Sequence, residues 1–141
     1  MAGMTTIRAG AECVLEDRRR TAPSLGGAVT DKVVIFVTAP NRRESKKIAH
    51  HLVKRKLAAC VNISRPVESV YRWKGKIAED KEFLLIIKSS GALFSEIKAE
   101  ISKIHSYQTP EIICLPISAG SDAYLQWLSK SLKAAGSEKG T

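Results

Sequence analysis

The sequence predicts a domain of the α+β class built on an antiparallel sheet. Two observations support this. Short apolar runs of strand length alternate with longer segments whose apolar residues recur every three or four positions. Their order along the chain is β-α-β-β-α-β, followed by one more helix. That order is typical of the ferredoxin-like split β-α-β arrangement, so we expect a ferredoxin-like antiparallel sheet with an added C-terminal helix.

The domain is expected to begin with a strand over residues 32–38. Five consecutive apolar residues in this run indicate that both of its faces are covered. Ala39-Pro40 ends the strand, and Asn41 caps the following helix with Glu44 three residues later as a capping box. The helical spacing of apolar residues then continues to Leu57.

The middle of the domain is expected to hold a second and a third strand. The second covers residues 58–64, is interrupted at Arg65-Pro66 and continues over 67–73. Lys74-Gly75 is a turn signal, and the polar pair Glu79-Asp80 belongs to the same connection. The third strand covers residues 82–88 and is again apolar on both faces.

The last part of the domain repeats the pattern. Apolar residues at helical spacing predict a helix over 90–104, and an apolar run predicts a fourth strand over 112–117. Ser121 caps the C-terminal helix. Two helices cover only one face of a four-stranded sheet, yet the first and third strands are apolar on both. An uncovered apolar face would be an oversized exposed patch, so we expect an oligomer that buries it.

Composition and charge restrict the class of protein and the kinds of site that the chain can contain. The chain has 141 residues, 44% of them hydrophobic, and a formal net charge of +9. No apolar run approaches the roughly 18 residues of a membrane helix, so no membrane association is expected. Three cysteines without CxxC spacing give no structural zinc motif. We expect tails at 1–30 and 135–141 around a domain at 31–134, and a cytoplasmic location, with organelle targeting by the N-terminal tail as the alternative.

The segment from Asn41 to Leu57 is the most basic part of the chain. It carries seven lysines and arginines against Glu44 alone. Such a helix attracts nucleic acid, anionic lipid or an acidic partner, but more often it is a solvated outer face. The third strand lacks the aromatic pattern of RNA-recognition domains, so nucleic acid is not an expected partner, and non-specific binding through the basic helix is kept only as a distant alternative.

Function is expected to concentrate in the loop that joins the second long helix to the fourth strand. Residues 104–111, IHSYQTPE, place an imidazole, a phenol, an amide, a hydroxyl and a carboxylate in one short connection. Loops on a rigid scaffold often carry binding residues. The alternative is a polar connection whose side chains only satisfy local backbone groups.

Several motifs in order resemble the CutA divalent-cation-tolerance family. They are VTAPN at 37–41, KLAACVNI at 56–63, VYRWKGKI at 70–77, LLIIK at 84–88, YQTPEII at 107–113 and YLQWL at 124–128. The resemblance implies a ferredoxin-like subunit of a homotrimer. It also implies a protein that is not an enzyme and that acts in tolerance to copper or another divalent cation. Animal members of this family are linked to acetylcholinesterase anchoring, which leaves a scaffold or partner-binding module as the alternative.

The resemblance also implies candidate metal donors. The family's proposed copper site uses a cysteine where this chain has Val37 and a histidine where it has Ile104, and neither side chain ligates a metal. Glu82 matches the carboxylate donor. A different set of Cys60, Glu82 and His105 is the candidate metal site here, whereas the alternatives are a small buried thiol at Cys60 and a structural hydrogen-bonding role for His105.

A second candidate site is a cleft between subunits. Its expected lining consists of aromatic, cationic and carboxylate side chains at strand ends. Lys88 and Glu111 are expected either to pair with each other or to line the cleft. The expected lining residues are Tyr71, Trp73, Lys88, Tyr107, Thr109 and Glu111. The alternative for Tyr71 and Trp73 is packing at a hairpin or a subunit contact.

Overall fold

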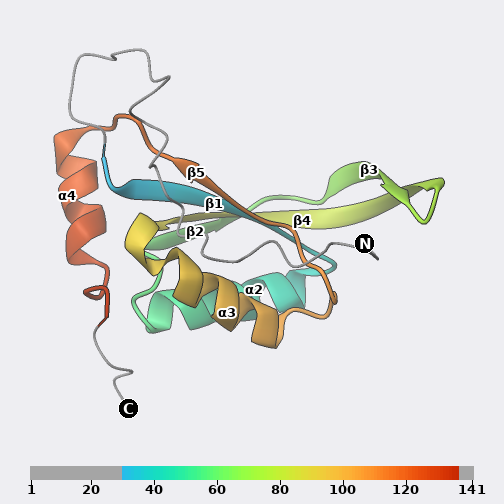
Figure 1. Cartoon of the computed structure of the whole chain (residues 1–141), viewed down its shortest axis with the longest axis horizontal. Coiled ribbons are helices and arrows are strands. Elements are labelled where there is room, and N and C mark those ends of the chain that lie inside the picture. The colour runs from blue at the N-terminus through green and yellow to red at the C-terminus, as the bar shows by residue number, and fades with distance from the viewer. Residues whose placement is uncertain (1–29, 137–141) are drawn as a thin grey trace.

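The computed structural model describes residues 30–136, so the expected tails at 1–30 and 135–141 lie almost wholly outside the described residues. One sheet and its helices make up this part of the chain (Figure 1). In chain order the elements are β1 (Lys32–Ala39), α2 (Arg42–Lys54), β2 (Cys60–Ile63), β3 (Val67–Trp73), β4 (Lys76–Ser90), the 3-10 turn η2 (Gly91–Leu93), α3 (Phe94–Ile104), β5 (Ile112–Pro116) and α4 (Asp122–Lys130).

The sheet is antiparallel throughout, which confirms the expected α+β class. Its strand order is β2-β4-β1-β5, and β3 pairs only with β4. The central pair aligns Ile35 with Ile87 and Val37 with Leu85, and these four side chains are fully buried. Strands β1 and β4 therefore form the middle of the core.

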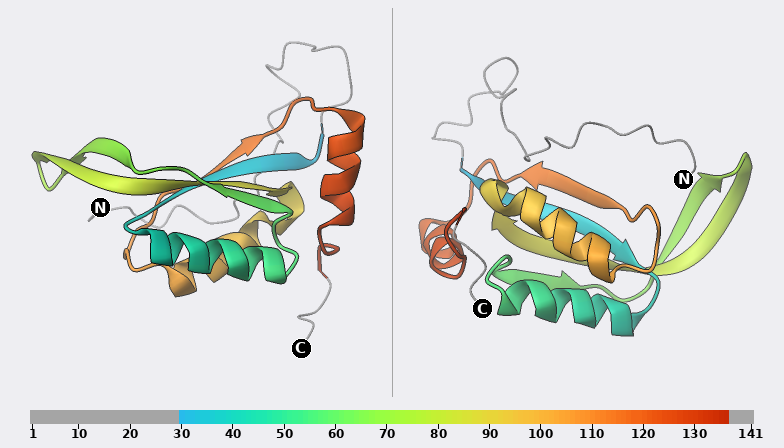
Figure 2. Two further views of the ribbon diagram at one scale, coloured as in Figure 1. Left: turned by 180° about the vertical axis from the view of Figure 1, so that it is seen from behind. Right: turned by 60° about the horizontal axis from the view of Figure 1, so that its bottom comes forward.

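Helices α2 and α3 cover one face of the sheet, as expected (Figure 2). Asn41 caps α2 as predicted, because its side chain accepts the backbone N–H of Glu44 at 2.8 Å. Buried apolar side chains of the two helices close the core against the sheet; they are Ile48, Leu52, Phe94, Ile97 and Ile101.

The end of α2 differs from the prediction. The helix stops at Lys54 rather than continuing to Leu57, because Lys56 takes a left-handed conformation with φ of 57°. The N–H of Leu57 then donates to the carbonyl of Leu52 and that of Lys56 to the carbonyl of Val53, which is the Schellman pattern of helix termination. Leu57 stays fully buried at this turn.

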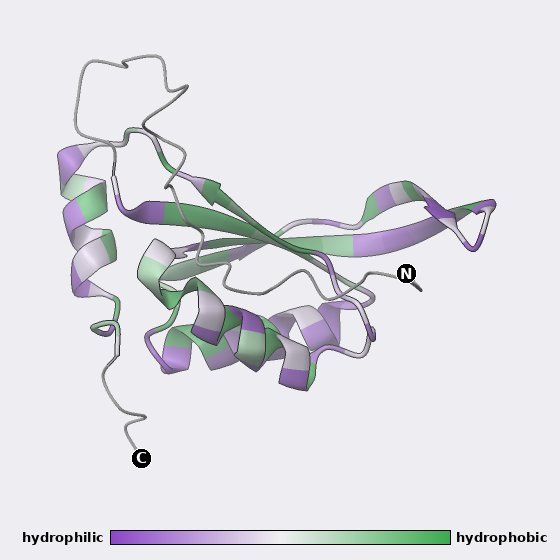
Figure 3. Cartoon of the chain, in the orientation of Figure 1, coloured by the Kyte–Doolittle hydropathy of each residue, from purple (hydrophilic) through white to green (hydrophobic). Residues whose placement is uncertain are grey.

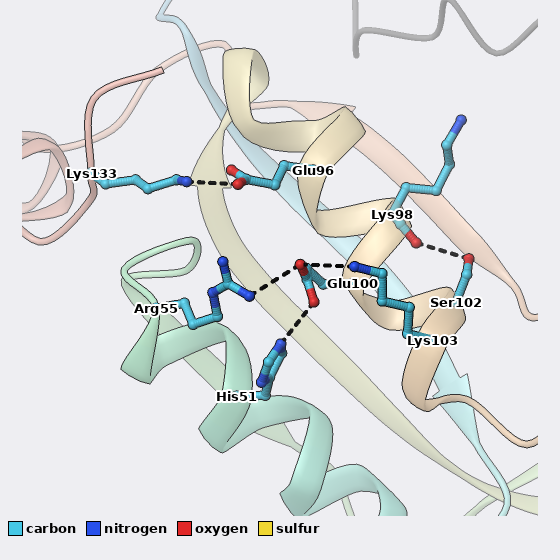
Figure 4. A network of polar contacts seen from close by, with 8 residues as sticks. All are labelled: His51, Arg55, Glu96, Lys98, Glu100, Ser102, Lys103 and Lys133. Atoms are coloured by element: carbon cyan, nitrogen blue, oxygen red, sulfur yellow. Dashed lines mark hydrogen bonds and ion pairs between the residues drawn. The ribbon is translucent and has the colours of Figure 1, made fainter. Parts of the chain in front are cut away.

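A buried carboxylate joins α2 to α3 (Figure 4). The side chain of Glu100 is 6% exposed and lies 3.0 Å from His51 Nε2, 3.1 Å from Arg55 Nη1 and 3.5 Å from Lys103 Nζ. The hydrogen bond from His51, reinforced by the positive charges of Arg55 and Lys103, lowers the pKa of Glu100 despite its burial. The network fixes the relative position of the two helices.

Strand β4 is much longer than predicted. It begins at Lys76, so Glu79 and Asp80, which were assigned to a connection, lie within the strand. The reason is the two-residue turn Lys74-Gly75, whose positive φ values of 48° and 77° begin the pairing with β3 at once. Residues 67–82 form a two-stranded arm that projects beyond the helices (Figure 2), and we call it the β3–β4 arm.

The opposite face of the sheet is apolar and no described helix covers it. Ile113 and Leu115 of β5 are 48% and 40% exposed, and they lie beside Phe36 and Val34 of β1 in the strand register. Figure 3 shows the hydrophobic colour running along both strands. Val70 and Ile77 on the β3–β4 arm are more exposed still. No helix among residues 30–136 is both long and apolar enough to cross a membrane.

Candidate functional site

His105 ends α3 and begins the loop in which we expected function. Its side chain is fully buried. Nε2 lies 2.7 Å from the carbonyl oxygen of Thr38, and Nδ1 lies 3.0 Å from the backbone nitrogen of Tyr107. A carbonyl only accepts and a backbone N–H only donates, so Nε2 carries the proton and Nδ1 accepts. The ring thus links the end of β1 to the loop.

This arrangement limits what His105 can do. An imidazole ligates a metal through an unprotonated nitrogen, and the one such nitrogen here is already bonded to Tyr107 N–H. The carboxylate of Glu44 lies 3.7 Å from Nδ1 and accepts a hydrogen bond from Ser106 Oγ at 3.1 Å. The two hydrogen bonds of His105 connect β1 to Tyr107, and they are consistent with the structural alternative for this residue.

Tyr107 points at Glu82, the carboxylate at the root of the β3–β4 arm. The phenol donates to Glu82 Oε2 at 3.3 Å. Glu82 is only 8% exposed, and it is the last residue of β4 that pairs with β3. Burial, together with the negative charge of Glu82, raises the pKa of Tyr107 to about 12. At neutral pH the phenol keeps its proton.

Three more residues contribute to the same region. On the arm, the Tyr71 hydroxyl donates to the Asp80 carboxylate, which raises the pKa of Tyr71. In the loop, the pKa of Glu111 is raised, mainly by its partial burial and to a lesser extent by the negative charge of Glu82. We call Tyr71, Asp80, Glu82, Tyr107 and Glu111 the carboxylate–phenol cluster.

The cluster has more negative charge than the described chain neutralises. Within residues 30–136, no ion pair involves Asp80, Glu82 or Glu111. Carboxylate oxygens are donors for divalent cations. No group of three or more His, Cys, Asp or Glu side chains in the described part of the chain is close enough to hold a metal ion. The described part of the chain thus carries an anionic cluster at this place without a complete metal-binding group.

Cys60 and Lys88 lie at the other end of the sheet. They face each other across β2 and β4, with the ammonium 3.9 Å from Sγ. Lys88 is six residues from Glu82 along β4, which corresponds to about 20 Å. Within one chain the structure therefore does not bring Cys60, Glu82 and His105 together, nor does it pair Lys88 with Glu111.

The remaining expected residues lie at the edges of this region. Trp73 is at the tip of the β3–β4 arm, next to the turn, with Lys74 Nζ 5.9 Å from its ring centre. Thr109 is exposed in the loop. Of the six residues expected to line a cleft, Tyr71, Tyr107 and Glu111 converge, whereas Lys88 and Trp73 do not join them.

Sequence reasoning missed Asp80 as a member of the cluster. Residues 78, 80 and 82 occupy alternate positions of β4 and so share one face. Continuing the third strand backward from Glu82 by this period would have placed Asp80 beside it. The signal was present, but two adjacent acidic residues after a glycine turn were interpreted as part of a connection.

Comparison with known proteins gives consistent matches. The model of the family described as CutA1 divalent ion tolerance protein matches residues 33–131. The "Divalent-cation tolerance protein CutA" of Thermus thermophilus is 41% identical over 98 residues, which are 70% of this chain and 95% of that protein. The crystal structure of CutA1 from Oryza sativa superposes with a TM-score of 0.72 at 42% identity, covering 74% of this chain and 96% of that chain.

A plant relative extends the match toward the N-terminus. "Protein CutA, chloroplastic" of Arabidopsis thaliana is 44% identical over 119 residues, which are 84% of this chain. The match covers only 61% of the Arabidopsis protein's own length. The antiparallel fold, the family match over 33–131 and the identity across nearly the whole Thermus protein agree, and the chain belongs to the CutA1 divalent ion tolerance protein family.

Proposed function

We propose that this chain is a subunit of a homotrimer that binds a divalent cation at the carboxylate–phenol cluster and acts, without catalysis, in the response to such cations. The observation that carries the proposal is the nearly buried Glu82, bonded to Tyr107 and beside Glu111, with no cationic partner among residues 30–136. An uncompensated buried carboxylate is costly, and a bound cation would remove that cost. The printed description of the family, divalent ion tolerance, supports the same class of ligand.

Assembly is the second part of the proposal. Exposed apolar residues on the outer sheet face and on the β3–β4 arm support it. A two-stranded hairpin alone is marginally stable in water, so the arm needs a surface to lie on. A three-fold arrangement is what the family resemblance implies. A neighbouring subunit would also supply the donors that the cluster lacks.

The donor set bears on which metal fits. Oxygen donors dominate the cluster, and oxygen suits harder divalent cations. The thiol of Cys60 is remote, His105 has no free nitrogen, and Val37 and Ile104 occupy the positions of the family's proposed donors. A thiolate–imidazole copper site does not fit these residues within one subunit. The proposed ligand is therefore a divalent cation bound by oxygen.

Location is proposed from the plant relatives. The Arabidopsis and rice proteins are both named chloroplastic, and the Arabidopsis match, at 119 of the chain's 141 residues, is too long to avoid the first 30 residues. We propose a plastid location in place of the cytoplasmic one. A fluorescent protein fused to the C-terminus of the whole chain should enter plastids of plant cells, and diffuse cytoplasmic fluorescence would contradict this.

Native mass spectrometry tests the binding proposal. The purified chain is titrated with Mn(II), Zn(II) and Cu(II), beside Glu82→Gln and the matched control Glu79→Gln. Glu79 lies on the same strand, is exposed, and points to the opposite face. We expect a trimer that takes up cations at the cluster, with uptake lost in Glu82→Gln and kept in Glu79→Gln.

Three results would contradict the proposal. A trimer without cation uptake would leave the scaffold or partner-binding role as the surviving alternative. Equal cation uptake by the wild type and by Glu82→Gln would mean that the cations bind outside the cluster. A monomer at micromolar concentration would refute the assembly, whatever the metal result.

A further inference from the structure

Helix α2 carries a row of exposed cations. Arg42, Arg43, Lys46, Lys47 and Lys54 are all exposed. None of the five forms an ion pair with another described residue. The one acidic residue of the helix has its carboxylate engaged with the loop after α3. The positive charge of this face is therefore not neutralised within the described chain.

The cations follow the helix axis. Residues 43, 47 and 54, with the exposed His50 between them, are spaced i, i+4, i+7 and i+11, which places them on one line along the helix. Residues 42 and 46 flank this line. From Arg42 to Lys54 the helix rises about 18 Å. We call these five cations the α2 stripe.

Side chains around the stripe restrict its partner. The apolar side of α2 is used by the core, since Ile48 and Leu52 are fully buried, so the helix has no apolar face to insert into a membrane. No exposed phenylalanine, tyrosine or tryptophan lies on α2 or α3; the exposed tyrosines and tryptophans of the described chain lie on the arm, in the loop and on α4. Protein interfaces and single-stranded nucleic acids both use aromatic anchors. A surface of cations alone fits a regular line of phosphates.

We propose that the α2 stripe binds the phosphate backbone of double-stranded nucleic acid, without reading its sequence. Duplex DNA carries about one phosphate charge per 1.7 Å of axis, so an 18 Å length carries about ten, and because both strands wind around the axis only those on the near side face the helix; five contacts with the five cations are the upper limit. Lysine and arginine contacts of this kind position a protein on a duplex and carry no base information.

The stripe is compatible with the proposed assembly. It lies in the helix layer, whereas the exposed apolar residues of β5 lie on the opposite face of the sheet (Figure 1). Oligomerisation through that face leaves α2 open. The inference does not depend on cation binding at the carboxylate–phenol cluster, and the two can fail separately.

Fluorescence anisotropy of a short random-sequence DNA duplex tests the proposal with the whole chain. The stripe variant is Arg43→Gln, Lys47→Gln and Lys54→Gln combined, because glutamine keeps helix propensity. Five phosphate contacts predict that log K falls against log salt with a slope of about −4.5. Losing three of them should reduce this slope to about −1.8 and weaken binding by more than about tenfold at low salt.

The matched control removes three charges elsewhere. Arg65→Gln, Lys76→Gln and Lys130→Gln combined give the same net charge, and all three residues are exposed on other elements. Both variants keep the arginines of residues 1–30, so the tail contributes equally. We expect the control to retain most of the affinity and the slope, and circular dichroism to show both variants folded.

The outcomes decide the matter. Loss of duplex affinity in the stripe variant, with retention of that affinity in the control variant, supports the proposal. Equal loss in both would mean that binding follows net charge, and no binding at low salt would mean that the face is only solvated; either result overturns it. Tighter binding to phosphatidylserine vesicles than to the duplex, lost in the stripe variant, would also overturn it and assign the stripe to anionic membranes.

Discussion

Two different amides at position 105 separate the two hydrogen bonds of the imidazole. In His105→Asn the side-chain oxygen takes the place of Nδ1 and accepts from the N–H two residues on, as asparagine does in turns. In His105→Gln the amide nitrogen reaches the place of Nε2 and donates to the Thr38 carbonyl, but Tyr107 N–H loses its acceptor. The first variant keeps Tyr107 in place and the second releases it.

The pKa of Tyr107 reports where its phenol lies. It is raised from 10.0 to about 12 by burial and by Glu82. A difference of two pKa units would correspond to about 2.7 kcal/mol of differential interaction between the protonated and the ionised phenol. Tyr107 is 38% exposed, so water screens part of this interaction, and a smaller effect is expected. We expect His105→Gln to lower the pKa of Tyr107 by about one pH unit, and His105→Asn to leave it near the wild-type value.

An ultraviolet titration of tyrosinate absorbance measures this change. The chain has three tyrosines, so Tyr107→Phe identifies which step belongs to Tyr107. Each variant leaves one polar group unpaired and should lose about 1–3 kcal/mol of stability, similar in both. A loss of stability alone therefore does not separate them, whereas the Tyr107 titration does.

The opposite result would refute the positioning role. If Tyr107 titrates at the wild-type pH in His105→Gln, its contact with Glu82 does not depend on the Nδ1 bond. If it shifts equally in both variants, the Thr38 bond or the ring volume matters and not the acceptor. Cation affinity measured on the same variants should follow the Tyr107 pKa, provided that the phenol belongs to the binding site.

Three further predictions concern stability and assembly. Glu100→Gln should lower the free energy of unfolding by about 2 kcal/mol at neutral pH. Because the pKa of Glu100 is lowered in the folded state, this difference should be present above pH 4.5 and should disappear as the pH falls below 4.5. Urea titrations at a series of pH values measure it. Asn41→Ala should cost about 1 kcal/mol by removing the α2 cap, measured by thermal denaturation, and an unchanged Tm would contradict the cap. Ile113→Asp should dissociate the oligomer in light scattering, whereas unaltered mass would exclude the outer face as the interface.

Most of the fold was predictable because its signals are local. The asparagine cap of α2, the Lys74-Gly75 turn and the apolar runs of β1 and β4 each depend on a few neighbouring residues. The incorrect predictions concerned the ends of helices and strands. Strand β4 was started six residues late, because a solvated two-stranded arm carries polar residues on both faces and so lacks the apolar pattern of a strand.

The site was harder to predict because its decisive contacts are distant in sequence. His105 and Thr38 are 67 positions apart, and their hydrogen bond places the proton on Nε2, which leaves Nδ1, already bonded to Tyr107 N–H, as the unprotonated nitrogen. Simple strand geometry, however, would have excluded one grouping. It concerns the expected pair of Lys88 and Glu111. Strands β4 and β5 both pair antiparallel with β1, which aligns Lys88 with Val34 but begins β5 opposite Val37, so the two residues lie toward opposite ends of the sheet.

The position of Glu82 links the proposed cation binding to the proposed oligomer. It is the last residue of the β3–β4 arm and a member of the carboxylate–phenol cluster, so any surface that fixes the arm also fixes the cluster. The arm has too little apolar burial of its own to stay rigid. Cation affinity should therefore depend on protein concentration in the range where the oligomer forms. Such a dependence would account for carboxylates at this point without a complete set of metal donors among residues 30–136.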